Sequence, residues 1–111
     1  MNKEKQVAFI SQKLKEQFEE LKEGKFEDKQ LYMFIDRAIT DLKNNPNCGI
    51  KIPKDLWPKT YLQNYKITSL WKYDLPNAWR LIYTIKSDEI TIVSIILEWF
   101  THKDYEKRFK Y

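Results

Sequence analysis

Apolar side chains recur every three or four residues through the first 45 positions, which is the spacing of one face of an α-helix. Gly24 separates two such runs, and the second ends at Asn-Asn-Pro, residues 44–46, with Asp28 as the expected N-cap. The polar faces mix Lys and Glu, whereas a helix lying on a membrane surface would need a basic face. We therefore expect a helical hairpin that packs on the core through these residues: Val7, Ile10, Leu14, Phe18 and Leu21, then Leu31, Phe34, Ile35, Ala38 and Leu42.

After residue 70 the apolar period changes to two, which is typical of strands with one buried face. Three antiparallel strands are expected, at residues 70–75, 79–85 and 90–99. The proline-rich segment before them, 46–69, predicts a long loop with one short strand near 49–52. The last segment, 101–111, predicts a short helix that begins at Thr101 and returns Phe109 to the core.

These elements predict an α+β fold: an N-terminal helical hairpin packed on a small antiparallel sheet of three to four strands, with a short C-terminal helix. A length of 111 residues with 42% hydrophobic content suits one core, so we expect a single domain over residues 1–111. The chain has no stretch near the roughly 18 apolar residues that cross a bilayer, and no apolar run follows its charged first residues. A cytoplasmic protein without a membrane partner is expected.

Composition also limits the chemistry. One cysteine, Cys48, excludes an internal disulfide framework, and one histidine, His102, leaves too few ligands for a zinc site. We expect no metal and no cofactor.

The net charge of +4 arises entirely after residue 45, where the chain has eleven basic and seven acidic residues. This excess favours an anionic partner, although many basic proteins bind no nucleic acid.

The strand around Arg80 carries the first candidate site. Alternation places Trp79, Leu81 and Tyr83 on the helix-facing side, so Arg80 points the other way, and Lys72 of the preceding strand belongs to the same face. A strand arginine has little rotamer freedom, and its planar fork suits a phosphate. The alternative is an exposed or salt-bridged arginine without a functional role.

His102 follows the last strand in a polar segment, Thr-His-Lys-Asp-Tyr, where a core histidine is unexpected. An imidazole can donate or accept a proton in phosphodiester cleavage. A lone histidine is nevertheless more often structural than catalytic.

Lysines and aromatic residues alternate through the loop before the sheet. Proteins that bind single-stranded RNA combine aromatic rings, on which the bases stack, with amines that hold the phosphates. Equally, the rings could pack inward while the lysines keep the loop soluble. The residues concerned are Lys51, Lys54, Lys59 and Lys66, with Trp57, Tyr61 and Tyr65.

Three runs and the chain's ending carry a resemblance to a known family. The runs are Gly-Ile-Lys-Ile-Pro-Lys at 49–54, Ser-Leu-Trp-Lys-Tyr-Asp-Leu at 69–75 and Trp-Arg-Leu-Ile-Tyr-Thr-Ile at 79–85, and the ending is His-Lys-Asp-Tyr at 102–105. In this order, after a helical hairpin, they resemble the RelE/ParE family of toxins from type II toxin-antitoxin systems. The resemblance covers nearly the whole chain.

The resemblance to the RelE-like branch implies an endoribonuclease, or mRNA interferase, that cleaves messenger RNA, often on the ribosome, and is neutralised by a bound antitoxin. Such enzymes use the substrate's own 2′-hydroxyl as the nucleophile. Carried over by position, Arg80 stabilises the phosphate, and His102 and Tyr105 complete the catalytic set. We expect all three to border an open cationic hollow. The implied RNA-binding residues are Lys51, Lys54, Lys72 and Lys103.

Two other interpretations remain open. The chain could be a non-enzymatic family member, either a ParE-like inhibitor of DNA gyrase or an inactive protein that retains only the antitoxin interface. It could also be a general basic nucleic-acid binder, which would show steep salt dependence and no cleavage products.

Overall fold

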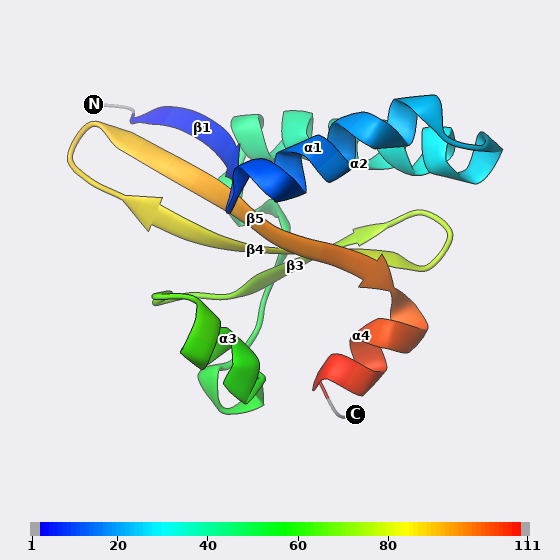
Figure 1. Ribbon diagram of the computed structural model, residues 1–111. Coiled ribbons are helices and arrows are strands. Elements are labelled where there is room, and N and C mark those ends of the chain that lie inside the picture. Colours follow the sequence, from blue (N-terminus) through cyan, green and yellow to red (C-terminus); the bar gives the residue numbers. More distant parts are fainter. Residues whose placement is uncertain (1–2, 110–111) are drawn as a thin grey trace.

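The computed structural model describes residues 3–109, in which one five-stranded sheet carries helices on both faces (Figure 1). Residues 1–2 and 110–111 lie outside the described residues. They are the ends of the predicted domain, and residues 110–111 also end the segment predicted to contain the C-terminal helix. The strands are β1 (Glu4–Phe9), β2 (Ile50–Lys51), β3 (Trp71–Leu75), β4 (Trp79–Ser87) and β5 (Thr91–Thr101). The α-helices are α1 (Gln12–Glu20), α2 (Phe26–Asn44), α3 (Lys59–Asn64) and α4 (His102–Phe109), and the 3-10 turns are η1 (Leu21–Glu23), η2 (Pro46–Cys48) and η3 (Lys54–Leu56).

The strand order is β1-β5-β4-β3-β2, and every neighbouring pair is antiparallel except β1 with β5. The predicted α+β class is confirmed, as are the short strand near residue 50, the three-strand meander and the C-terminal helix. The sheet nevertheless has five strands in place of three to four, and it is mixed. None of the helices within residues 3–109 combines the length and apolar content that crossing a bilayer requires.

The fifth strand comes from a segment that the sequence assigned to the first helix. Residues 4–9 pair in parallel with residues 91–96 of β5, and Val7 and Phe9 are half-buried on alternate positions. The helix begins only after Ser11, whose hydroxyl accepts a hydrogen bond from the Leu14 amide at 3.1 Å. Val7 therefore lies in a strand. The spacing from Val7 to Ile10 and Leu14 fits a helix as well as it fits a strand followed by a turn and a new helix.

The second helix, α2, follows the prediction closely except at its start. Lys25 is the N-cap residue, and Asp28 occupies the third helical position, from which its carboxylate accepts the Lys25 amide at 3.1 Å. Asp28 thus caps the helix from inside and is not the N-cap. The buried stripe consists of Leu31, Ile35, Ala38 and Leu42.

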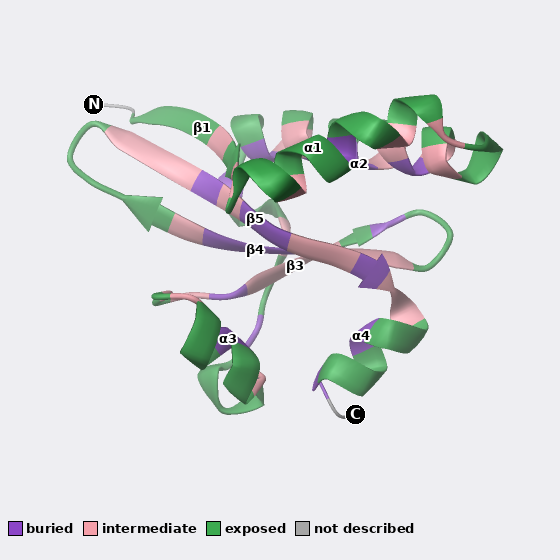
Figure 2. Ribbon diagram, viewed as in Figure 1, coloured by how far each residue is buried: buried purple, intermediate pink, exposed green. Residues whose placement is uncertain are grey.

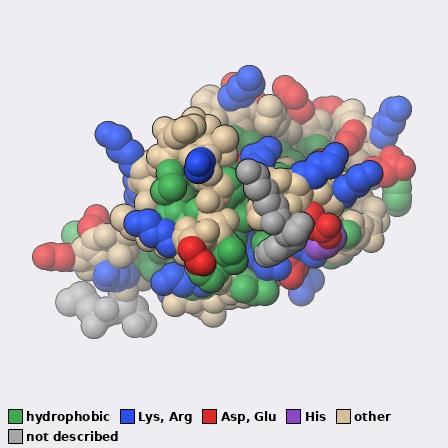
Figure 3. Space-filling model, turned by 90° about the horizontal axis from the view of Figure 1, so that it is seen from below, with side chains coloured by type: hydrophobic (Ala, Val, Ile, Leu, Met, Phe, Trp, Pro, Cys, Tyr) green, Lys and Arg blue, Asp and Glu red, His purple; other side chains and the backbone are tan. Residues whose placement is uncertain are grey.

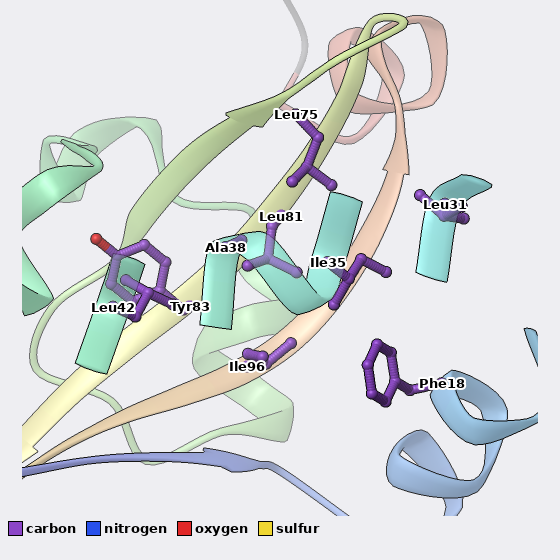
Figure 4. Packing of buried hydrophobic residues seen from close by; sticks show 9 residues of the cluster. All are labelled: Phe18, Leu31, Ile35, Ala38, Leu42, Leu75, Leu81, Tyr83 and Ile96. Carbon is purple, nitrogen blue, oxygen red and sulfur yellow. The ribbon is translucent and has the colours of Figure 1, made fainter. Parts of the chain in front are cut away.

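Alternation along β4 divides the protein into two cores. Leu81 and Tyr83 point toward α1 and α2, where they meet the stripe of α2 in the first core, drawn in Figure 4. Figures 1 and 2 show that α1 and α2 cover this face and keep their outer sides exposed.

Ile82 points to the opposite face, which α3, α4 and the loop between β2 and α3 cover. The second core there consists of Ile52, Trp57, Tyr61, Leu70, Ile82, Leu97, Phe100, Tyr105 and Phe109. The aromatic residues Trp57 and Tyr61, which the sequence offered as possible stacking platforms for RNA, are buried in it. This face is therefore filled across its centre and is not the open hollow that we expected beside Arg80.

A buried hydroxyl ties the loop before the sheet to β4. Tyr83 donates to the Pro46 carbonyl at 2.8 Å and accepts the Gly49 amide at 3.1 Å. A Cβ at Gly49 would lie 2.6 Å from this hydroxyl and 2.5 Å from the Lys72 carbonyl, so only glycine fits there. One side chain thus satisfies two backbone groups and fixes the entry into β2.

We expect Tyr83→Phe to lower the free energy of unfolding by about 1–3 kcal/mol, because it leaves a buried amide and a carbonyl without their partner. Urea denaturation followed by circular dichroism measures this change. Tyr32→Phe is the matched control: its ring stacks on Phe18 at 4.5 Å, and within residues 3–109 its hydroxyl bonds no backbone group. Equal stability losses in the two variants would contradict the anchoring role of Tyr83.

Candidate active site

Three chain segments bring the predicted catalytic residues together at one end of the sheet. β3 and β4 pair so that Asp74 lies opposite Arg80, and the first residue of α4, His102, follows directly from β5. The turn between β3 and β4 places Asn77 and Ala78 at φ values of 58° and 61°, a left-handed conformation that non-glycine residues adopt at a cost. The His102 amide donates to the Ala78 carbonyl at 2.6 Å, so this turn fixes where α4 begins.

Arg80 points away from α1 and α2, as predicted, but its guanidinium is enclosed. Its Nη2 lies 3.0 Å from His102 Nδ1, and its Nη1 donates to the Trp79 carbonyl at 3.1 Å. Its Nε lies 3.0 Å from Asp74 Oδ1, yet this N–H is not aimed at the oxygen, so the contact is an ion pair and not a hydrogen bond. Only 16% of the side chain is exposed.

The hydrogen bonds of His102 define which ring nitrogen carries the proton. A guanidinium has donors only, so Nδ1 must accept from Arg80, and the proton of the neutral ring then resides on Nε2. Nε2 meets the Glu106 carboxylate one helical turn further along α4. Glu106 therefore orients the imidazole from one side while Arg80 holds it from the other.

Tyr105 lies on the side of His102 that faces the second core. The two rings stack with centroids 6.3 Å apart, and the Tyr105 ring packs against Phe100 and Phe109 in the second core. The Lys72 ammonium lies 5.5 Å from the centroid of the same ring. Tyr105 is thus near the predicted partners but buried, and in this arrangement its ring supports His102 and Lys72.

The remaining lysines do not join this cluster. Lys51 pairs with Trp71, which packs on the first core, so its side chain belongs to the opposite face of the sheet from Arg80. Lys54 lies in η3, and Lys103 is exposed on α4. Within residues 3–109 neither forms an ion pair or side-chain hydrogen bond. Of the four predicted RNA-binding lysines, only Lys72 lies in the cluster around Arg80 and Asp74, with its Nζ 3.3 Å from Asp74 Oδ1.

The site is charge-compensated, in contrast to the cationic hollow that we expected. Asp74 and Glu106, which sequence reasoning missed, pair with Arg80, Lys72 and His102. Two signals could have found them: the His-x-x-x-Glu spacing, which places both side chains on one helix face, and the Lys-x-Asp spacing along β3. Figure 3 shows this side of the molecule, where Lys and Arg side chains surround patches of apolar surface.

Two large cavities adjoin other parts of the sheet, and Asp74 lines the first of them. One, of about 950 Å³, lies between α2 and β3, and the other, of about 890 Å³, lies between η3–α3 and β5–α4. Neither is lined by Arg80 or His102. Within residues 3–109 no three His, Cys, Asp or Glu side chains are grouped so that they could hold a metal ion.

The single thiol is a poor candidate nucleophile. Partial burial, together with the nearby Asp41 carboxylate, raises the pKa of the Cys48 thiol above its ordinary value. The nucleophilic thiolate is therefore disfavoured near neutral pH. This leaves the Arg80–His102 cluster as the arrangement with reactive potential: a fixed guanidinium that can hold an anion beside an oriented imidazole that can move a proton.

Comparisons of the chain with protein-family models, with curated proteins and with solved structures gave no match.

The tautomer of His102 can be tested independently of any activity. We expect 15N NMR of the neutral ring to show the proton on Nε2, and we expect Arg80→Ala to increase the population of the Nδ1-protonated form because the obligatory donor is gone. Arg37→Ala, which removes an exposed guanidinium from α2, should leave the ring signals unchanged. A wild-type ring protonated on Nδ1 would contradict the geometry described above.

Proposed function

We propose that this protein is a RelE-like toxin: a cytoplasmic endoribonuclease that cleaves messenger RNA in association with the ribosome and is neutralised by a cognate antitoxin. The observation that carries the proposal is the direct contact of Arg80 with His102. The resemblance assigns both residues to catalysis, and they come from segments 22 residues apart in the chain. Tyr105, also implied by the resemblance, and Lys72, which alternation predicts on the same face as Arg80, lie in the same cluster.

The proposed reaction needs no cofactor. The ribose 2′-oxygen attacks the adjacent phosphorus, the bond from phosphorus to the 5′-oxygen breaks, and the products are a 2′,3′-cyclic phosphate and a 5′-hydroxyl. One group must take the proton of the 2′-hydroxyl, another must return a proton to the 5′-oxygen, and a cation must stabilise the charge that grows on the phosphate. Arg80 supplies the cation, with Lys72 beside it, and water supplies the proton that the leaving 5′-oxygen takes.

His102 is the group placed to move a proton. While Arg80 donates to Nδ1, that lone pair is occupied. When a phosphate takes the Nη2–H that Arg80 now donates, Nδ1 becomes free to accept the 2′-hydroxyl proton, and Glu106 stabilises the imidazolium that forms, since it already accepts Nε2–H. Substrate binding and activation of the base are thus coupled through one arginine.

Purified protein incubated with translating ribosomes should cut messenger RNA, and Arg80→Ala should reduce the cleavage rate by roughly 10²–10³-fold while remaining folded. Arg80→Lys should restore only part of it, because an ammonium cannot form the two parallel bonds of a guanidinium. Lys43→Ala is the control, because it removes an exposed cation from α2, which lies on the other side of the sheet.

Intact message with the wild-type protein, together with stalled DNA gyrase, would contradict the nuclease proposal and favour the ParE-like alternative. Intact message and unaffected gyrase would favour an inactive antitoxin-binding protein. The compensation of Arg80 by Asp74 is the observation that favours a non-enzymatic role.

The groove between α2 and β3 supports the antitoxin part of the proposal. Phe26 and Met33 line it and are 74% and 68% exposed, which is unusual for large apolar side chains. Its Asp41 is already engaged by Tyr73, and burial followed by this hydrogen bond raises the pKa of Tyr73 to about 12. Its two basic residues, Lys29 and Arg37, form no ion pair with any carboxylate in residues 3–109. An acidic segment with apolar anchors is the complement of such a groove.

We expect a short acidic protein encoded next to this chain to bind there and to relieve its toxicity on co-expression. Phe26→Glu should abolish co-purification and relief, and it leaves α2 intact because an acidic residue suits the first helical turn. Ile90→Glu is the matched control, since Ile90 is equally exposed, at 74%, but lies in the β4–β5 turn. Undiminished binding by Phe26→Glu would exclude this groove as the interface.

A further inference from the structure

One carboxylate oxygen links the two cations of the proposed active site. Asp74 Oδ1 lies 3.0 Å from Arg80 Nε and 3.3 Å from Lys72 Nζ. The strand register produces this contact: Lys72 and Asp74 are two residues apart on the same face of β3, and Arg80 lies directly across on β4. An anionic oxygen held between a guanidinium and an ammonium is also the arrangement in which proteins hold a phosphate oxygen.

The exposed fractions show which member of this group is free to move. The side chains of Arg80 and Lys72 are 16% and 19% exposed, whereas that of Asp74 is 45% exposed. The two cations are therefore held by the surrounding sheet and α4, and Asp74 can rotate toward solvent without breaking packing.

Arg80 Nε supplies a second, independent observation. It is fully buried, and within residues 3–109 its N–H has no hydrogen-bond partner, because Asp74 Oδ1 is close but out of line. A buried donor without a partner carries a free-energy cost, and an acceptor placed in line with it would remove that cost. The Asp74 carboxylate thus neutralises the charge of Arg80 but leaves the Nε–H without a hydrogen bond.

Resting on the proposed function, we propose that Asp74 is an internal stand-in for the substrate phosphate and determines which anions the site accepts. Its carboxylate occupies the anion position formed by Lys72 and Arg80 when RNA is absent, and an RNA phosphate displaces it. Each anion that enters must compete with a carboxylate tethered to the same strand. A single small anion competes poorly, whereas an RNA chain adds further contacts along its length.

The exchange also accounts for the state of the histidine. Nη2 carries two N–H groups, so a phosphate at the Nε–Nη2 edge frees His102 Nδ1 when it takes the N–H that Nδ1 now accepts. In that case the event that expels Asp74 also frees the base. With Asp74 in place, the base stays occupied and the site is closed to solution phosphate.

Asp74→Asn tests the proposal, because asparagine keeps the shape and removes the charge. We expect it to bind inorganic phosphate and a non-cleavable 2′-O-methyl RNA oligonucleotide on the order of tenfold more tightly, with the larger relative gain for inorganic phosphate. Isothermal titration calorimetry measures both, and the 15N shift of Arg80 Nε reports whether the anion sits at this guanidinium.

Glu98→Gln is the matched control. It removes the same charge from an ion pair on the same face of the sheet, where Glu98 meets Arg108 at 2.8 Å; Glu98 lies opposite Ile82 and, within residues 3–109, forms no ion pair with Arg80. Glu98→Gln should change either affinity by less than about twofold. The double variant Asp74→Asn with Arg80→Ala should lose the gain, because the two residues act on one anion position.

The outcomes separate this inference from the nuclease proposal. Unchanged or weaker anion binding by Asp74→Asn would overturn it and make Asp74 a positioning residue for Arg80. An equal gain in Glu98→Gln would also overturn it, since net charge alone would then explain the result. If no variant cleaves messenger RNA but Asp74→Asn binds the oligonucleotide more tightly, the nuclease proposal fails while the role of Asp74 stands.

Discussion

The alternation of side chains along β4 is the constraint on which the rest of the structure depends. Leu81 and Tyr83 enter the first core, and Ile82, between them, enters the second, so consecutive residues of one strand are fully buried on opposite faces. A shift of one residue would exchange the two cores and expose both sets of partners. Because this register cannot slip, the direction of Arg80, one residue before Leu81, is determined as firmly as the cores themselves.

The site inherits its geometry from that register. Arg80 meets Asp74 because the strands are paired, and it meets His102 because the left-handed turn at Asn77 and Ala78 presents a carbonyl to the first amide of α4. Sites that rest on paired strands and helices hold their geometry better than sites carried by loops. Lys51 lies apart from the cluster because the pairing of β2 with β3 places it on the other face of the sheet, and Lys54 lies apart because it belongs to η3, outside the sheet.

The sequence was informative wherever one period held over a whole element. The period of two predicted β3, β4 and β5, although β4 is buried on both faces, and the spacing of three and four residues predicted α2, which has one continuous buried stripe. The apolar spacing gave a wrong prediction at Val7, because the distance from Val7 to Ile10 and Leu14 fits a single helix as well as it fits a strand followed by a helix. For the second core the sequence predicted the return of Phe109 but left open whether Trp57 and Tyr61 pack inward, since they come from a segment without a period and are buried by contacts distant in the chain. Among the site residues, the face of Arg80 followed from alternation, whereas its pairing with Asp74 required the register of two strands.

Local neutrality and overall charge have separate consequences here. The +4 net charge acts over the distance of a Debye length, about 8–10 Å in physiological salt, and favours the approach of a polyanion. At contact the cations of the cluster are already paired, so the approach gains little there until a carboxylate leaves. In the proposed exchange, attraction over a distance combined with displacement of Asp74 would select ligands that bring several phosphates, because only these contact the unpaired surface lysines while one phosphate competes for Arg80. The proposed site would in this way discriminate a nucleic-acid chain from the far more abundant small anions around it.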